Sequence, residues 1–175
     1  MIKIVSKRGN NLASQGTDSG YDLMAKGFSR IVGNKVQEET WFGGEMEGVT
    51  VAPNETILIK TGIHLQLPEP KARRTWYGKI VGAYIMEAQV RNRSGLSLKY
   101  NTYVKWGTID NDYRGDCGVM FWNNSDVDFV IERDDRVAQL VFTTIYKPFK
   151  GIGSIMVDSL LDTERGSGGF GSTGV

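Results

Sequence analysis

The sequence contains only one cysteine, Cys117, and one histidine, His64. A single thiol cannot form a disulfide within the chain, and zinc sites built from His and Cys need several such ligands. One histidine also leaves little basis for a nucleophilic Ser–His pair. Any chemistry that the chain performs is therefore expected to use carboxylates, guanidinium groups, hydroxyls and backbone groups.

The chain also lacks a long apolar run and an excess of charge of one sign. No window approaches the roughly 20 apolar residues of a membrane-spanning helix, and the basic N-terminus precedes no apolar stretch. The formal net charge is +1, so no broad positive field gathers duplex nucleic acid or anionic membranes. We expect a cytoplasmic protein, in a host cytoplasm if the gene is viral, with no nucleic-acid or membrane partner.

What the chain does have is a series of short segments rich in Val, Ile, Thr and aromatic residues, separated by Gly, Asn, Asp and Pro. This pattern is typical of strands and turns. The predicted strands span residues 3–6, 49–52, 56–61, 64–67, 80–91, 104–109, 118–123, 129–132 and 136–146. With 175 residues, of which 40% are hydrophobic, one all-β barrel or jelly roll is favoured, with one helical turn following Arg93.

Two stretches have the composition of insertions on such a scaffold. Residues 28–48 are polar and Gly-rich, and residues 69–78 carry Lys71, Arg73 and Arg74. Surface loops take up such additions at small entropic cost. The basic cluster is either a solvated loop or a surface that binds a partner or steers a nucleotide.

The C-terminal segment, residues 165–175, consists mostly of Gly, Ser and Thr around Phe170 and cannot build a core of its own. It lacks the Lys and the strand-then-helix context of a Walker loop. Its glycines nevertheless permit close backbone approach to phosphates, Arg165 and the hydroxyls of Ser172 and Thr173 can donate, and Phe170 can stack on a base. A linker without function is the alternative.

Residues 107–118 form a polar, Gly-containing turn between two strand-like segments. A β-hairpin of this kind exposes backbone groups that can read the edge of a flat ligand. An ordinary hairpin in which Asp110 and Asp112 favour the turn explains the same residues, so composition leaves both readings open.

Arg93, Ser94 and Gly95 place a guanidinium, a hydroxyl and an unhindered N–H within three residues, which together can surround a phosphate. A polar helix start with Ser94 as its cap is the alternative.

Further along, a strand beginning at Arg136 would place Arg136 and Ala138 on one face and Val137 and Gln139 on the other. A buried Arg136 would need a carboxylate, for which Asp22 is the candidate.

Five short motifs, in this order along the chain, resemble those of the homotrimeric dUTPase family. They are Ser19-Gly20-Tyr21-Asp22-Leu23, Arg93-Ser94-Gly95-Leu96-Ser97, residues 107–118, Asp135-Arg136-Val137-Ala138-Gln139-Leu140 and residues 165–174. The resemblance implies a distorted all-β jelly roll or barrel made by residues 1–164, and a C-terminal arm, residues 165–175, exchanged within a trimer. It also implies Mg²⁺-dependent cleavage of dUTP to dUMP and diphosphate.

The resemblance also implies roles for individual residues. Asp110 resembles the general base that directs water at the α-phosphorus, and Tyr113 resembles the residue that packs under the deoxyribose. The other implied contacts are Gly107 and Gly118 with uracil, Arg93, Ser94, Gly95 and Gln139 with the phosphates, and Arg165, Phe170, Gly171, Ser172 and Thr173 in the closing arm. Asp22 resembles the acid that supports both the water shell of Mg²⁺ and Arg136, and Mg²⁺ is expected to be held mainly by substrate phosphates and waters.

Two other functions stay open. A dCTP deaminase, or a bifunctional deaminase-dUTPase, would need a glutamate to handle water at the base, and Glu87 and Glu132 both lie outside the 107–118 hairpin. A dUTP-sensing interaction protein would keep the same fold and bind a protein partner through the stretches 28–48 and 69–78.

Overall fold

Strands make up almost all of the regular structure in the computed structural model, which describes residues 1–9, 12, 14, 16–33, 35–149 and 154–163. The elements, in chain order, are β1 (Lys3–Ser6), β2 (Tyr21–Met24), β3 (Gly27–Val32), β4 (Lys35–Val36), β5 (Thr40–Trp41), β6 (Gly48–Val51), β7 (Thr56–Lys60), β8 (Ile63–Gln66), β9 (Lys71–Arg74), β10 (Ile80–Arg91), α1 (Ser94–Tyr100), β11 (Thr102–Val104), β12 (Gly107–Ile109), β13 (Val119–Asn123), β14 (Phe129–Glu132) and β15 (Arg136–Pro148). The all-β prediction is confirmed.

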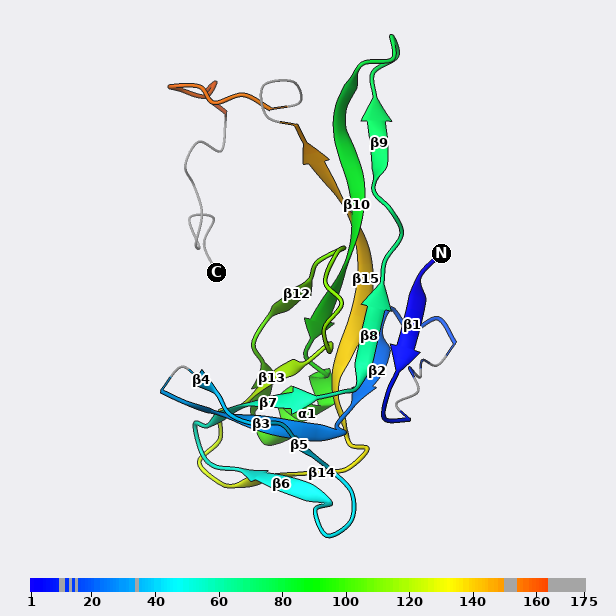
Figure 1. Ribbon diagram of the computed structural model, residues 1–175. Coiled ribbons are helices and arrows are strands. Elements are labelled where there is room, and N and C mark those ends of the chain that lie inside the picture. The colour runs from blue at the N-terminus through cyan, green and yellow to red at the C-terminus, as the bar shows by residue number, and fades with distance from the viewer. Residues whose placement is uncertain (10–11, 13, 15, 34, 150–153, 164–175) are drawn as a thin grey trace.

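Two larger sheets build the body of the molecule. One has the strand order β12-β10-β15-β2, with β9 added to β10, and the other has the order β11-β13-β7-β3-β4, with β5 added to β3. The smaller pairs β1-β8 and β14-β6 complete it. In Figure 1 the long strand β15 starts inside the body and continues well beyond it, and β10 runs antiparallel to β15 from the far end into the body, accompanied at the far end by β9.

The core lies between the sheets and follows the alternation of side chains along the strands. On β13, Val119 and Phe121 are buried whereas Met120 between them is exposed. On β7, Ile57 and Ile59 are buried and face the same core. The strand predictions are therefore confirmed where one face of a strand is apolar and the other is exposed to solvent.

The two stretches expected as insertion loops contain strands. β3 pairs with β7 from Gly27↔Lys60 to Arg30↔Ile57, so the start of residues 28–48 belongs to a central sheet. In residues 69–78, β9 pairs with β10 and makes a hairpin. Polar composition concealed both strands because the side chains of β9 are exposed and β3 buries only alternate positions.

The single strand predicted for residues 104–109 is also corrected. It divides into β11, which pairs with β13, and β12, which pairs with β10. The chain passes here from one sheet to the other, through the exposed residues Lys105 and Trp106. A hydrophobic pattern alone cannot reveal a change of pairing partner.

The predicted helical turn after Arg93 is confirmed as α1. Its N-cap is Arg93, in an extended conformation and without a side-chain capping hydrogen bond, so the reading of Ser94 as the cap was wrong. Within the described part of the chain, no helix has the length and apolar character required to cross a membrane.

Candidate active site

Asp22, Arg93 and Arg136 meet at one corner of the β2–β15 pair. Nε of Arg93 donates to Oδ1 of Asp22 at 3.0 Å, and Nη1 of Arg136 donates to Oδ2 of the same carboxylate at 3.4 Å. Nη1 of Arg93 also donates to the carbonyl oxygen of Arg136 at 3.0 Å. One carboxylate thus orients two guanidinium groups, and the cluster retains a net positive charge that suits phosphate oxygens.

The sequence anticipated this contact but not its form. Asp22 was the candidate partner for a buried Arg136, whereas the Arg136 side chain is 52% exposed and Asp22 is the more enclosed partner at 15%. The predicted alternation after Arg136 was wrong as well, because the β15–β2 register shifts between Arg136 and Ala138. Val137 and Ala138 are consequently both buried, as a bulged strand permits.

The other residues predicted to contact phosphate lie close to this cluster. Gln139 pairs with Asp22 on β2 and with Arg91 on β10. Ser94 and Gly95 open α1 directly after Arg93, and both are exposed. A Cβ atom on Gly95 would meet nothing within 4 Å, so its backbone is open to a ligand.

A cleft of about 850 Å³ adjoins the cluster. It includes Arg93 and Arg136 and extends between α1 and β14, where Leu96, Tyr100, Phe129 and Val130 supply apolar surface. Sequence reasoning did not find this cleft, because its two walls come from segments about 30 residues apart that only the fold brings together.

Asp110 lies on a different part of the sheet. It follows β12, in which Ile109 pairs with Ala88 of β10, and it is exposed to solvent. Its neighbour Asn111 holds the turn in place, because Nδ2 of Asn111 donates to the carbonyl oxygens of Pro68 at 2.9 Å and Met86 at 3.0 Å. Asn111 is a positioning residue that the motif reading overlooked.

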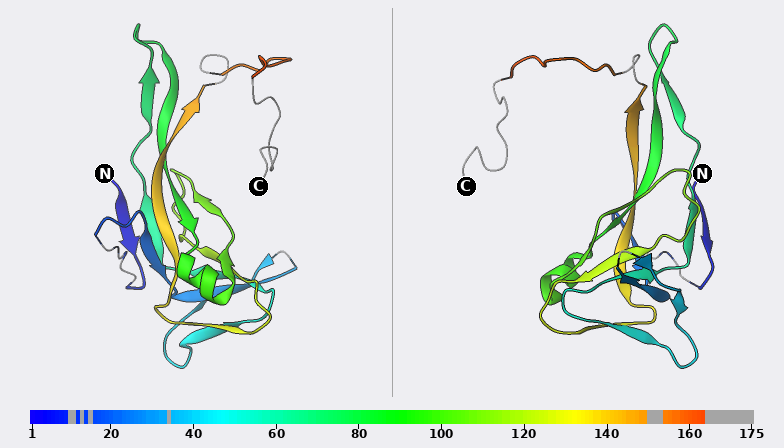
Figure 2. Two further views of the ribbon diagram at one scale, coloured as in Figure 1. Left: turned by 180° about the vertical axis from the view of Figure 1, so that it is seen from behind. Right: turned by 60° about the vertical axis from the view of Figure 1, so that its left-hand side comes forward.

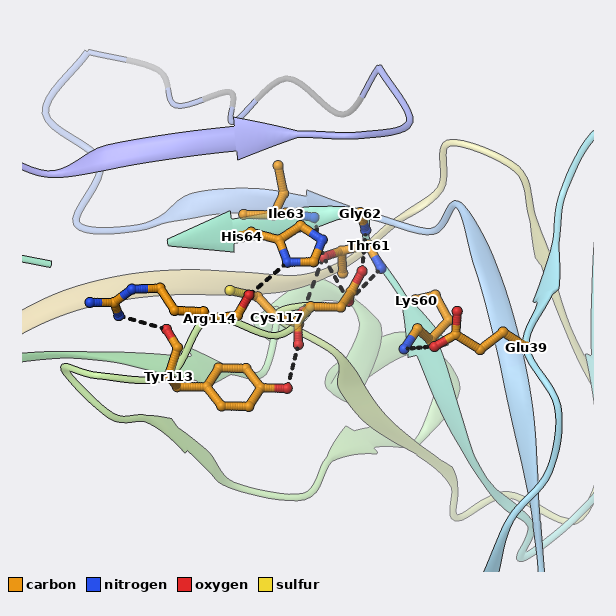
Figure 3. A network of polar contacts seen from close by, with 10 residues as sticks. Glu39, Lys60, Thr61, Gly62, Ile63, His64, Tyr113, Arg114 and Cys117 are labelled. Atoms are coloured by element: carbon orange, nitrogen blue, oxygen red, sulfur yellow. Dashed lines mark hydrogen bonds and ion pairs between the residues drawn. The ribbon is translucent and has the colours of Figure 1, made fainter. Parts of the chain in front are cut away.

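The returning side of the hairpin is fastened to the β7–β8 turn, as Figure 3 shows. The carboxylate of Asp116 accepts hydrogen bonds from the backbone N–H groups of Gly62 at 2.6 Å and Thr61 at 3.1 Å. Nδ1 of His64 lies 3.0 Å from the carbonyl oxygen of Arg114. The single histidine therefore supports the hairpin, and Asp116 fixes where it leaves the sheet.

Tyr113 folds back over Gly115. A Cβ atom on Gly115 would lie 2.2 Å from the Tyr113 hydroxyl oxygen, and this hydroxyl donates to the carbonyl oxygen of Asp116 at 3.2 Å. A residue with any side chain at position 115 would displace the ring. Gly118 is confined similarly, because its Cβ would lie 2.9 Å from Cδ1 of Leu58.

A second cleft, of about 690 Å³, borders Tyr113 and Gly115 on the side of β5, β7 and the residues that follow β1. Lys60 forms an ion pair with Glu39 there, and its hydrogen bond lowers the pKa of the Glu39 carboxyl from its ordinary value while partial burial opposes this.

Beneath the hairpin, burial, assisted by the charge of Asp116, raises the pKa of the Cys117 thiol to about 12.

Within one chain, Asp110 of the hairpin and Arg93 of the Asp22–Arg93–Arg136 cluster lie at opposite ends of the β10–β12 pairing. Asp110 comes after the residue that pairs with Ala88, whereas Arg93 follows the other end of β10. Five residues of extended chain separate Ala88 from Arg93, which corresponds to about 16 Å. The arm residues Arg165, Phe170, Gly171, Ser172 and Thr173 lie outside the described residues.

Nothing in the described part of the chain brings together three or more His, Cys, Asp or Glu side chains that could hold a metal ion. A hard cation such as Mg²⁺ can nevertheless be bound by one or two carboxylates together with phosphate oxygens and waters. The partly accessible carboxylates of Asp22 and Asp110 fit that mode of binding and do not fit a protein-only metal cage.

Fold and site together define an all-β protein with two guanidinium groups held by one aspartate and a hairpin that exposes backbone groups. These features suit the binding of nucleoside phosphates. The family model described as dUTPase matches residues 46–174. The chain belongs to the dUTPase family.

Individual relatives agree with this assignment. A deoxyuridine 5'-triphosphate nucleotidohydrolase of Alkaliphilus metalliredigens is 36% identical over 182 residues, which cover 100% of this chain and 99% of that protein. One of Clostridioides difficile is 42% identical over 131 residues, which cover 74% of this chain and 78% of that protein. The similarity therefore extends well beyond the five motifs.

Solved structures agree on the fold. A Staphylococcus bacteriophage 80alpha dUTPase mutant with dUpNHpp has a TM-score of 0.71 at 23% identity, covering 100% of this chain and 99% of that chain. A mutant dUTPase from phage phi11 of S. aureus, described with a structural Mg(II) ion, has a TM-score of 0.60 at 20% identity, covering 94% and 99%. The expected dUTPase-like jelly-roll fold is confirmed.

Proposed function

We propose that this protein hydrolyses dUTP to dUMP and diphosphate. The observation that carries the proposal is the similarity over the full chain to a deoxyuridine 5'-triphosphate nucleotidohydrolase. The exposed Asp110 on a fixed hairpin and the Asp22-braced arginines supply groups of the kinds that this reaction needs.

In the proposed reaction, Asp110 orients a water molecule and accepts its proton. The water oxygen forms a bond to the α-phosphorus while the bond from that phosphorus to the bridging oxygen breaks, and diphosphate leaves. This reaction requires positioning and charge stabilisation and no covalent nucleophile. A general base contributes about 10²–10⁴-fold in rate, so the groups around the phosphates must supply the remainder.

The phosphate contacts are assigned to Arg93, Ser94, Gly95 and Gln139, with Arg136 held beside them by Asp22. Guanidinium groups fixed in advance by a carboxylate stabilise developing negative charge without having to reorganise. The hydroxyl of Ser94 is exposed and the backbone of Gly95 is open, so both can approach the phosphate oxygens closely.

We propose that the substrate phosphates would bind Mg²⁺ and that Asp22 would accept hydrogen bonds from the water molecules around the ion. When bound, the cation neutralises charge on the phosphate oxygens. Asp22 keeps lone pairs available beyond those that face Arg93 and Arg136, because each carboxylate oxygen accepts more than one hydrogen bond.

Selection of the nucleoside is assigned to the 107–118 hairpin. The backbone around Gly107 and Gly118 reads the uracil edge, and the Tyr113 ring packs under the deoxyribose where a 2′-hydroxyl would collide. The confinement of Tyr113 over Gly115 supports this assignment because it restricts where the ring can lie.

We further propose a trimer in which residues 1–164 form the barrel domain and residues 165–175 form an arm that closes a neighbouring site. A triphosphate is shorter than the extended chain from Ala88, next to which Asp110 lies, to Arg93, which is about 16 Å; this supports a site that takes Asp110 and Arg93 from different copies. Arg165, Ser172 and Thr173 would donate to phosphates, Gly171 would allow close approach, and Phe170 would cover the base.

The experiment that tests the function is a steady-state comparison of dUTP, UTP, dTTP and dCTP, with and without Mg²⁺, measuring both diphosphate and ammonia. We expect diphosphate from dUTP alone, and only with the cation. Equal release from UTP would contradict the sugar assignment, and ammonia from dCTP would identify a deaminase instead.

A further inference from the structure

The far end of the β9–β10–β15 ribbon stands apart from the body of the molecule in all the views of Figures 1 and 2. It carries positive charge, and the nearest acidic residues along β9 and β10 are Glu69 and Glu87, outside this end. Residues 70–86 and 136–149 contain no Asp or Glu, and the cations there include Lys71, Arg73 and Lys147. A net charge of +1 for the whole chain therefore hides a local excess.

One face of this ribbon combines cations with aromatic rings. Lys71 of β9 lies opposite Tyr84 of β10, and Tyr84 lies opposite Tyr146 of β15, so cross-strand pairing places all three on the same face. The tyrosine rings are 5.6 Å apart between centroids, and the guanidinium of Arg73 lies 5.3 Å above the Tyr146 ring. Tyr84 and Tyr146 remain 43% and 39% exposed.

Gly82 keeps this face open. It lies between Arg73 and Pro148 in the register, and a Cβ atom on it would come 2.6 Å from the Tyr146 ring. The absence of a side chain there allows Tyr146 to lie across the ribbon, where its ring can present surface to a ligand.

The hairpin tip adds two more rings. Trp76 is 96% exposed, and it contacts the exposed Tyr77 edge to face, with centroids 5.3 Å apart. Arg74 supports the turn through a hydrogen bond from Nη1 to the carbonyl oxygen of Gly78 at 3.0 Å. Large apolar side chains on a formed turn that leaves them in solvent are typical of a contact surface.

We propose that this basic–aromatic strip, defined as Lys71, Arg73, Trp76, Tyr77, Tyr84 and Tyr146, binds single-stranded nucleic acid. Sheet surfaces that bind single strands use aromatic rings to stack on bases and nearby cations to follow the phosphates. A second copy of this chain is disfavoured as occupant, because two strips would bring like charges together.

This site is separate from the proposed hydrolytic site. The strip comes closest to that site at Tyr84, and Asp110 follows the residue paired with Ala88; four residues of strand correspond to about 13 Å. Binding at the strip therefore goes beyond dUTP hydrolysis and can be measured without it.

The test is fluorescence anisotropy of the full chain with labelled 20-nucleotide oligo-dT and oligo-U, from 25 to 300 mM salt, beside a duplex of the same length. The variant Lys71→Ala/Arg73→Ala removes two cations of the strip. Its matched control is Lys3→Ala/Lys35→Ala, which removes two exposed lysines from β1 and β4. Trp76→Ala tests stacking at a position too exposed to disturb the core, and dUTP turnover reports folding of every variant.

We expect the unmodified chain to bind single strands more tightly than duplex. The strip variant should bind at least tenfold more weakly, with a log–log salt slope reduced by about 1.4 for two lost phosphate contacts. Trp76→Ala should weaken binding by about tenfold, and the control should stay within twofold. Comparison of oligo-dT with oligo-U then identifies which strand is preferred.

Three results would overturn the proposal. They are no binding by the unmodified chain at 25 mM salt, equal loss in the strip variant and its control, and equal affinity for duplex. Binding of phosphatidylserine vesicles without binding of oligonucleotides would assign the strip to membranes, and a changed oligomer mass in the strip variant alone would assign it to contact between copies.

Discussion

Nε of Arg93 and Oδ1 of Asp22 lie 3.0 Å apart, although 71 residues separate them in the sequence. Strand β2 supplies the acid, and the turn between β10 and α1 supplies the guanidinium. The same carboxylate also receives Arg136 from β15. One acidic side chain thereby determines the direction of both cations that we assign to the phosphates.

Replacing Asp22 with Asn should disturb both arginines while keeping the volume of the side chain. We expect a rise in KM for dUTP of tenfold or more, because the guanidinium groups lose their common charged acceptor. The free energy of unfolding should fall by about 1–2 kcal/mol, since Asp22 is mostly enclosed and Arg136 is half exposed. Steady-state kinetics and urea unfolding measure the two effects. Asp126→Asn, in an exposed turn, is the matched control, and equal behaviour of the two variants would contradict the assigned role.

Asp110→Asn tests the general base directly. The amide cannot accept the proton of water, so turnover should fall by about 10²–10⁴-fold, while binding of a non-hydrolysable dUTP analogue should persist in calorimetry. The melting temperature should change little because Asp110 is exposed. Turnover near that of the unmodified chain would remove the base assignment.

Gly115→Ala should displace the Tyr113 ring, because its Cβ would lie 2.2 Å from the hydroxyl oxygen. We expect the ratio of kcat/KM for dUTP over UTP to fall about tenfold, since the ring would no longer exclude a 2′-hydroxyl. A double-mutant cycle gives the control: in a Tyr113→Ala background the additional Gly115→Ala change should have almost no further effect. Additive losses would show that Gly115 acts independently of Tyr113.

Deletion of residues 165–175 tests the proposed closing arm, which lies outside the described residues. We expect the melting temperature to change little and efficient hydrolysis to be lost. Phe170→Ala should cost less than the deletion, and Phe170→Trp should restore part of that loss, because a larger ring can still stack on the base. Full activity of the truncated chain would exclude a closing arm, and equal damage from Ala and Trp would exclude stacking.

The buried thiol of Cys117 predicts a loss of stability at alkaline pH. Its pKa rises from the ordinary 9.0 to about 12 in the folded chain, so between these values the unfolded state binds fewer protons than the folded state. The contribution of this thiol to the free energy of unfolding has its full value below pH 9. Above pH 9 this contribution falls by up to about 1.4 kcal/mol per pH unit. Urea unfolding at pH 8.5 and 10.5 measures the slope. Cys117→Ala should show a shallower slope, and equal slopes would contradict the shift.

The predictions from the sequence pattern that the structure corrects share one cause. The strand predicted for residues 104–109 divides because its halves pair with different strands, and the alternation after Arg136 breaks because the register shifts there. Asn111 and Asp116 escaped notice because their roles depend on carbonyl and N–H groups of distant segments. A sequence pattern records which side chains an element has and does not record what lies opposite.

By itself the sequence determined the all-β class, the helical turn after Arg93, the five motifs and the composition of the tail, because strand alternation, turn residues and short motifs are local properties of a chain. Tertiary structure alone decided that Asp22 braces Arg93 as well as Arg136, that Tyr113 rests on Gly115, and that a basic segment becomes the edge of a projecting ribbon. Each of these depends on strand register and on groups distant in the chain, and such groups have no neighbours until the sheets form.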